Sequence, residues 1–394
     1  MEHLTLIIGV VIVTALVFDF TNGFHDTANA MATTISTGAL KPKTAVAMSA
    51  VLNLVGAFLS VEVAATISKG IIDEGSGIRP EVIFAGLVGA IVWNLLTWLA
   101  GLPSSSSHAL FGGLIGATLV SVGFDGVHFD AVVMKILIPA VAAPIVAGVA
   151  ALLATRLTYK LAQGRDPQDT TKGYRAGQIA SGALVSLAHG TNDAQKTMGV
   201  ITLALVTGGV IAPKSDPPLW VIVSAALAIA LGTYLGGWRI IRTMGKGLTD
   251  IQPPQGFAAQ TSSAAVILAS SHLGYALSTT QVCSGSIMGA GKGRRGAVVR
   301  WGTAGRMVAA WGLTLPAAGL VAGLAALLAD RGDWGVATVA VLGLAACTAI
   351  WVASRRKPVD HTNVNDVDPA TPIEPVIIPS PAAAAATPAP QATV

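Results

Sequence analysis

Two carboxylates lie within stretches of the chain that are otherwise apolar. Asp26 belongs to Gly-Phe-His-Asp-Thr-Ala-Asn-Ala-Met at 23–31, and Asp193 belongs to Gly-Thr-Asn-Asp-Ala-Gln-Lys-Thr-Met at 190–198. A charge at the centre of a bilayer costs at least about 2.5–3.5 kcal/mol on insertion scales, so such residues are rare unless they have a function. The alternative is a structural role in which each Asp caps a broken helix. Equivalent placement in two similar motifs favours a shared site.

Two runs of hydroxyl side chains follow these motifs in the same order. Residues 104–107 are four serines after Gly-Leu-Pro, and residues 278–280 read Ser-Thr-Thr just past Ser-His-Leu-Gly. Gly and Pro let the chain turn, so each run can begin a half-helix whose free backbone N–H groups bind an anion. Alternatively, the hydroxyls bond back to carbonyls within ordinary helices. Four consecutive serines would cover every face of such a helix, which favours the anion site.

An anion beside two carboxylates is repelled unless positive charge enters with it. Three sources stay open: protons on the Asp residues, sodium ions, or a divalent metal such as Mg²⁺ carried on the anion. Carboxylate and amide oxygens suit a hard cation. The predicted substrate-binding residues are Asp26, Asn29, Ser105, Ser106, Ser107, Asp193, Lys196, Ser278, Thr279 and Thr280. The predicted coupling-cation residues are Asn22, His25, Asp26, Asn192 and Asp193.

Basic and imidazole side chains beside the carboxylates can be interpreted in two ways. Lys196 stands where the first motif has Asn29. It pairs with Asp193 or the anion, unless it snorkels to a membrane interface. His25 can relay protons, whereas His108 and His189 are weaker candidates because a lone histidine is more often a hydrogen-bonded packing residue.

The composition indicates a membrane protein. Of 394 residues, 53% are hydrophobic and 11% are charged, and the mean hydropathy is +0.67, whereas a soluble domain carries about 25% charged residues. A membrane helix needs about 20 mostly apolar residues. Candidate segments lie at 4–38, 43–61, 82–100, 108–123, 131–155, 176–211, 218–238, 257–273, 275–290, 300–328 and 334–353. The first and the sixth are too long for simple spans, so we expect broken helices there. The segments 257–273 and 275–290 are short, so we expect one or both of them to be re-entrant.

The fold class that follows is an all-α polytopic membrane protein, an inverted repeat of about five spans each with broken helices and re-entrant hairpins. The first repeat is 1–155, a basic cytoplasmic loop is 156–175, and the second, inverted repeat is 176–353. Residues 354–394 are rich in Pro, Ala and polar residues, which predicts a disordered tail. Polar interruptions at matching places in two halves are typical of secondary transporters.

Lys and Arg are concentrated in every second loop between the candidate membrane segments. The basic segments are 41–43, 156–175, 239–246, 292–300 and 355–357. If every segment crosses, these all face one side. Since basic loops stay in the cytoplasm, we expect a multi-pass protein of the cell membrane with its N-terminus outside and its C-terminus inside. The lipid bilayer is then a partner and nucleic acid is not. A homo-oligomer stays open.

Four motifs in order resemble the inorganic phosphate transporter (PiT) family. They are the signatures at 23–30 and 189–196 and the hairpin sequences at 102–108 and 277–282, within a similarity that runs from about residue 4 to 350. His25 and Gln195-Lys196 are similar to the bacterial low-affinity branch. The resemblance implies cation-coupled import of inorganic phosphate. In that branch it implies protons as the coupling ion and phosphate as a neutral divalent-metal complex, whereas other members use sodium.

The sequence also departs from the family pattern and leaves other functions open. Lys196, Ala276 and Gln281 replace the family's Asn, Pro and His, which bears on the coupling ion. Another oxyanion such as sulfate, or a divalent metal alone, could be the cargo. A hydrolase built on Ser107, His108 and Asp26 is disfavoured because the chain has no Gly-x-Ser-x-Gly motif. A channel or scaffold would not need paired buried carboxylates. We therefore expect that the protein is not an enzyme and that it holds no resident cofactor.

Overall fold

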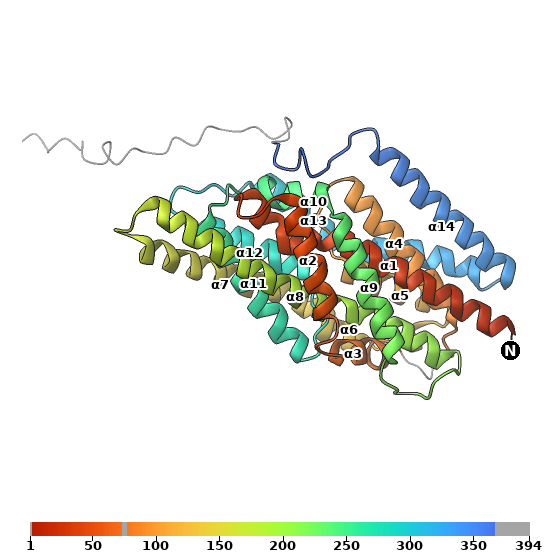
Figure 1. Ribbon diagram of the computed structural model, residues 1–394. Helices are drawn as coiled ribbons and strands as arrows, with labels where there is room; N and C mark the ends of the chain where they lie inside the picture. The colour runs from red at the N-terminus through yellow and green to blue at the C-terminus, as the bar shows by residue number, and fades with distance from the viewer. Residues whose placement is uncertain (1, 73–76, 367–394) are drawn as a thin grey trace, which may run out of the picture.

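The structure is a computed structural model that describes residues 2–72 and 77–366, and within these ranges the protein is helical without a β-strand. The helices lie side by side in one bundle, with α14 along one edge (Figure 1). The long helices are α1 (Glu2–Ser36), α4 (Pro80–Leu99), α7 (Ile138–Ala162), α8 (Pro167–Thr207), α11 (Pro253–His272), α13 (Trp301–Ala329) and α14 (Asp333–Ser354). The shorter ones are α2 (Pro42–Gly56), α3 (Glu62–Gly70), α5 (Ser106–Ser121), α6 (Phe129–Val132), α9 (Leu219–Leu235), α10 (Trp238–Arg242) and α12 (Thr279–Gly293). The all-α prediction is confirmed.

The expected breaks in the two longest segments are absent. α1 is one helix of 35 residues and α8 one helix of 41 residues, each continuous through its Asp motif. Neither motif contains Pro, and a single Gly inside a helix costs only about 1 kcal/mol relative to Ala. The polar side chains of the motifs are satisfied by other helices, so the backbone does not have to open there. The prediction of broken helices at 4–38 and 176–211 is therefore wrong.

The chain does turn at the two predicted hairpins. Gly101, between α4 and α5, has a φ of 65°, and Gly274, between α11 and α12, has a φ of 73°. Glycine adopts this left-handed conformation without steric cost. The hydroxyl of Ser107 on α5 donates to the carbonyl of Leu277 before α12, 3.2 Å away, so the two hairpin tips meet.

Some of these helices are long and apolar enough to span a membrane. Five described segments are long and apolar enough to cross a membrane: Leu6–Ser36, Pro80–Leu99, Phe129–Ala162, Trp301–Ala329 and Asp333–Ser354. A sixth is possible if α9 and the segment Trp238–Gly247, bent by 60° relative to each other, form one span. The protein is thus a multi-pass membrane protein. The full predicted set of crossings stays a prediction, because α8 and the two hairpins carry the polar residues of the site.

The two halves pack on each other reciprocally. α1 packs on α9 and α8 packs on α2, while α5 packs on α13 and α12 packs on α7. Close backbone contacts repeat the pattern: a Cβ atom at Gly23 would meet the carbonyl of Ile229, and one at Gly190 would meet that of Asn53. Such exchanged contacts are those that a two-fold-related repeat generates.

Helices α1 and α8 run in opposite directions where they touch. Gly182, early in α8, lies beside Thr34 near the end of α1, and Gly208, just past the end of α8, lies beside Ile8 near the start of α1. Helices in corresponding positions of an inverted repeat must be antiparallel in this way. The direction in which each half enters a membrane stays a prediction.

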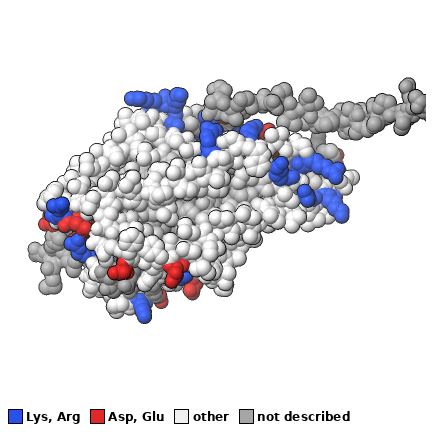
Figure 2. All heavy atoms as spheres, turned by 180° about the vertical axis from the view of Figure 1, so that it is seen from behind, with Lys and Arg blue, Asp and Glu red and all other residues white. Residues whose placement is uncertain are grey.

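Charged residues lie along the edges of the bundle, and a wide area of the face seen in Figure 2 carries none. Several basic segments meet at one end. Lys246 donates to the carbonyl of Ser36 at 3.1 Å, and Arg300 donates to that of Lys246 at 2.7 Å. Arg239 donates to the carbonyl of Ser354 at 2.8 Å. Loops that are far apart in the sequence are thus joined by hydrogen bonds at the end of the bundle where these Lys and Arg residues lie.

The first part of the predicted disordered tail, residues 355–366, is held against the rest of the protein. Arg242 donates to the carbonyl of Asn363 at 2.7 Å, and Val364 is buried. Polar contacts and one apolar anchor therefore fix residues 355–366 against α10, which a composition-based reading cannot detect. The rest of the predicted tail, 367–394, lies outside the described residues.

Candidate functional site

Asp26 and Asp193, 167 residues apart in the sequence, meet in the interior where α1 crosses α8. Both are almost completely buried. The hydroxyl of Thr279 lies 3.5 Å from Asp26 Oδ2 and 3.1 Å from Asp193 Oδ2, so it links the two carboxylates. His189 Nε2 lies 3.9 Å from Asp26 Oδ2 and 3.1 Å from Asp193 Oδ2. The predicted pair thus forms one centre, with an imidazole and a hydroxyl between its two acids.

The Asp26 carboxylate is surrounded by hydroxyls and one imidazole. Its Oδ1 atom lies 2.5 Å from His25 Nδ1. The same oxygen accepts hydrogen bonds from Ser106 at 3.1 Å and from Thr280 at 3.2 Å. On its far side, His25 Nε2 is 3.4 Å from the hydroxyl of Ser104. No Lys or Arg bonds to Asp26 within the described chain, so any positive charge beside it comes from a histidine, a proton or an incoming ion.

The Asp193 carboxylate has a lysine side chain as its partner. The ammonium of Lys196 forms an ion pair with Asp193 Oδ1, donates to the hydroxyl of Ser107 at 2.6 Å, and donates to the carbonyl of Leu277 at 3.0 Å. Lys196 is 1% exposed. It therefore does not snorkel to an interface, and it joins the second carboxylate to the tips of both hairpins.

The hydroxyl runs begin the two hairpin helices. The hydroxyl oxygen of Ser105 accepts from the backbone N–H of His108 at 3.1 Å, which makes Ser105 the N-cap of α5. Ser278 caps α12 in the same way, accepting from Gln281 at 3.3 Å. The positive ends of two helices thus point toward the carboxylates, and helix N-termini of this kind bind oxyanions. The caps still have their O–H groups to donate.

The three asparagines predicted for the site lie in different surroundings. Asn29 donates to Thr279 at 3.3 Å and to Thr280 at 3.1 Å, so it holds both hydroxyls in place. Asn192 instead turns its amide to Ser271 at 2.9 Å, at the end of α11. Neither side-chain atom of Asn22 has a hydrogen-bond partner among the described residues. Asn29 is therefore the one asparagine of the three that contacts the hydroxyls bound to the carboxylates.

His189 is the central residue that the sequence predicted least well. Its Nδ1 lies 3.1 Å from the side-chain oxygen of Asn53 on α2, which orients the ring so that Nε2 faces both carboxylates. Ligand atoms of Asp26, His189 and Asp193 lie within 4.8 Å of one another, a spacing that a metal ion could use. The signal in the sequence was the four-residue spacing of His189 and Asp193, which places both on one helix face.

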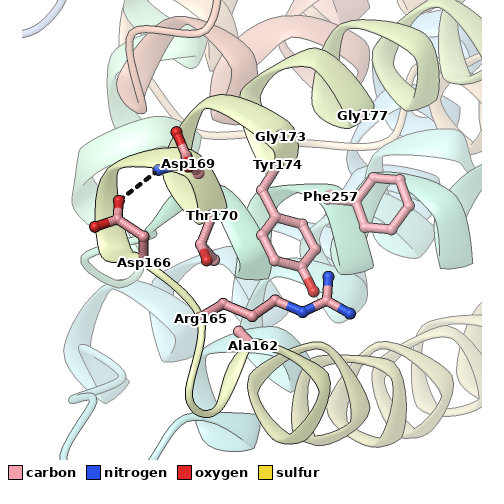
Figure 3. Close-up of a pocket in the computed structure, with 9 residues that line it drawn as sticks. All are labelled: Ala162, Arg165, Asp166, Asp169, Thr170, Gly173, Tyr174, Gly177 and Phe257. Carbon is pink, nitrogen blue, oxygen red and sulfur yellow. Dashed lines mark hydrogen bonds between the residues drawn. The ribbon is translucent and has the colours of Figure 1, made fainter.

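A surface pocket in the structure lies away from this centre. It is formed where α7 leads into α8, and Figure 3 shows the Arg165 side chain extended past the Tyr174 ring and Asp166 bonded to the backbone of Asp169. Asp166 accepts that bond at 3.0 Å as the N-cap of α8. The pocket thus belongs to the start of a helix in the basic connection and contains no predicted site residue.

An all-helical multi-pass protein with buried acids, a buried lysine and two helix N-termini at one centre is a membrane transporter in its architecture. Comparison with known proteins agrees with this class. The chain matches the phosphate transporter family over residues 22–168 and again over 158–322. It belongs to that family, whose members are transporters and not enzymes, and the resemblance noted from the motifs is confirmed.

Similar proteins span most of the chain. A probable low-affinity inorganic phosphate transporter of Mycobacterium bovis is 62% identical, over 90% of this chain and 86% of its own length. A protein of the same description from Bacillus subtilis is 42% identical, over 80% of this chain and 95% of its own length. A solved structure described as the sodium-dependent phosphate transporter has a TM-score of 0.75 at 22% identity and covers 82% of this chain and 99% of that one. At that identity, the likeness to it shows the fold alone.

Proposed function

We propose that the protein imports inorganic phosphate by symport with protons, and that phosphate travels as a complex with a divalent metal such as Mg²⁺. The observation that carries the proposal is the shell of hydroxyl donors around the paired carboxylates. Ser106, Thr279 and Thr280 all donate to Asp26 or Asp193. Phosphate oxygens and carboxylates compete for the same donors, so the substrate and the acids are linked through shared hydrogen bonds.

This competition supplies a physical basis for coupling. An ionised carboxylate keeps the hydroxyls and repels an anion. When a cation neutralises the carboxylate, the hydroxyls are released to turn to a phosphate oxygen and the repulsion falls. Binding of phosphate and of the cation therefore each favour the other, which a symporter requires. A metal ion on the phosphate would lower the repulsion further and could approach the acids directly, since hard cations prefer oxygen ligands.

Sodium coupling is the second candidate, and the description of the structural neighbour as sodium-dependent motivates it. The position of Lys196 argues against it. The ammonium already pairs with Asp193 inside the protein, and a sodium ion at the same carboxylate would be repelled by it. A proton, or a metal phosphate without net charge, is tolerated better. Transport of another oxyanion such as sulfate is tested by competition with labelled phosphate.

The basic connections that meet at one end support the orientation expected from the sequence. With Lys and Arg on the cytoplasmic side, the N-terminus lies outside and the residues after α14 lie inside, in the cell membrane. A cysteine placed at residue 125 in one variant and at residue 165 in another, labelled with an impermeant maleimide on intact cells, tests this. We expect labelling at residue 125, and labelling at 165 instead would reverse the orientation.

The direct test of the proposed function is uptake of labelled phosphate into proteoliposomes, with proton and sodium gradients imposed separately and with or without Mg²⁺. We expect uptake to follow the proton gradient, to need Mg²⁺, and to ignore sodium. Uptake driven by sodium alone would reject proton coupling and leave the fold unchanged. Uptake of sulfate in preference to phosphate would reject the substrate.

A further inference from the structure

A third buried carboxylate lies on α1, outside the centre formed by Asp26 and Asp193. Asp19 is 0% exposed, and neither of its oxygens has a hydrogen-bond partner among the described residues. It stands seven residues before Asp26, which places it about 10 Å away along the helix. Neighbouring residues 15–18 and Phe20 are apolar. Nothing in the described chain fixes the charge of this acid in the way that Lys196 fixes that of Asp193.

Two neutral polar side chains lie beside the Asp19 carboxylate. Asn22 is on the next turn of α1, and Thr197 comes from α8, one turn beyond Asp193. Asn22 and the Thr197 hydroxyl are both buried, and neither has a hydrogen-bond partner in the described structure. Three buried polar side chains from two helices therefore lie close together. Buried polar groups are normally paired, so this cluster is unusual for a protein interior.

An ionised carboxylate in this position would be very costly. Removing a charge from water without a partner costs several kcal/mol even after relaxation, and the usual outcome is that the group becomes neutral. The charged or titratable groups that act on Asp19 in the described residues are Asp193 and His189, both on α8. Asp193 is already paired with Lys196 and bonded to His189. Neither group supplies Asp19 with a cation of its own.

We propose that Asp19 carries the proton that moves with phosphate. The proton binds one carboxylate oxygen, and the neutral acid donates to Asn22 or Thr197. Asn22 and Thr197 are the two neutral side chains beside it, fewer oxygen ligands than a metal cation normally takes. Protonation also removes a negative charge that acts on Asp193, so the phosphate site one turn of α8 away accepts an anion more readily. Release of the proton on the far side restores the repulsion and helps to expel the substrate.

This inference rests on the proposed proton symport, and the experiment separates the two. Wild type and Asp19→Asn are compared in proteoliposomes for uptake driven by a proton gradient and for exchange of internal for external phosphate, which needs no net proton movement. We expect the variant to lose the gradient-driven component entirely while exchange persists. Thr118→Val, which removes a buried hydroxyl without a partner on α5, is the matched control and keeps both activities.

Each outcome decides one of the two proposals. If wild-type uptake follows sodium, the proposed function fails whatever Asp19 does. If wild-type uptake follows protons and Asp19→Asn accumulates phosphate equally well, Asp19 does not carry the proton. Should Asp19→Asn fail to fold, Thr197→Val keeps the carboxylate and removes the hydroxyl beside it. We then expect the pH midpoint of uptake to move upward, because the ionised acid loses a donor, and an unchanged midpoint would overturn the assignment.

Discussion

The two halves of the site share a geometry and differ in charge. Each half provides an Asp on a long helix and a hydroxyl run that begins a hairpin helix. In the first half Asp26 is bonded to a histidine and to neutral hydroxyls, whereas in the second half Asp193 is bonded to Lys196. The comparison teaches that two halves of similar shape can differ in the charge around their acids. Asp193 has a lysine as its partner, whereas Asp26 has no lysine or arginine partner in the described chain.

The largest expected effect is the loss of uptake when either acid is neutralised. Asp26→Asn and Asp193→Asn should each abolish coupled uptake, because a neutral amide cannot alternate between an ionised form that keeps the hydroxyls and a neutralised form that releases them to phosphate. The two variants should differ in stability. Asp193→Asn leaves the buried ammonium of Lys196 without its counter-ion, a change that typically costs about 3–5 kcal/mol, whereas Asp26 has no lysine or arginine partner in the described chain.

Thermal unfolding of the purified variants in detergent, measured beside uptake in proteoliposomes, checks both parts. Asp330→Asn is the matched control, since Asp330 pairs at 2.6 Å with a half-exposed Arg79. An exposed pair of that kind is worth at most about 1 kcal/mol. Near-normal uptake by both site variants would contradict the assignment, and equal destabilisation of the two would contradict the asymmetry.

The next effect is a change of coupling ion when the second half is made to resemble the first. Lys196→Asn removes the ammonium and restores the amide found at Asn29. We expect sodium to stimulate uptake in this variant and not in the wild type, because the repulsion of a sodium ion at Asp193 is gone. Lys292→Asn, which removes a lysine that contacts Trp301 near the end of α12, should keep the wild-type ion preference. If Lys196→Asn is inactive with every ion, the lysine binds substrate instead.

The smallest effect is expected from single hydroxyls. Replacing Ser106, Thr279 or Thr280 by Ala should weaken phosphate affinity by about 0.5–1.5 kcal/mol each, the usual net value of one hydrogen bond. Ser105→Ala and Ser278→Ala also remove a helix cap, which typically costs about 1 kcal/mol of stability. Apparent affinity from uptake and unfolding midpoints separate the two roles. Wild-type affinity in all five variants would place the anion elsewhere.

Much of the fold and of the site could be predicted from the sequence, because buried charge is rare enough in a membrane protein to be informative. The meeting of Asp26 with Asp193 and the helix starts at Ser105 and Ser278 follow from residue type and repetition. The continuity of α1 and α8 did not follow. Whether a polar motif breaks a helix depends on donors supplied by other helices, here Thr279 and Thr280, and a single sequence does not show which helices approach.

His189 and Asp19 also depend on packing that a single sequence does not show, one because of the partners it gains and the other because it has none among the described residues. His189 resembles a packing residue until α2 brings Asn53 against its far nitrogen and α1 brings Asp26 against the near one. The sequence does not indicate Asp19 as a site residue, because Asp19 has no counterpart among the repeated motifs. Its unusual feature is the absence of a hydrogen-bond partner in the described interior, which is a property of packing.

The central claim is that phosphate and protons move together, and the most direct measurement is the internal pH of proteoliposomes that contain a trapped pH-sensitive dye. Phosphate and Mg²⁺ are added outside in a sodium-free buffer. The account predicts acidification of the lumen that needs phosphate, needs Mg²⁺, and is absent from Asp26→Asn vesicles. Phosphate entry without acidification, or entry only after sodium is added, would contradict it.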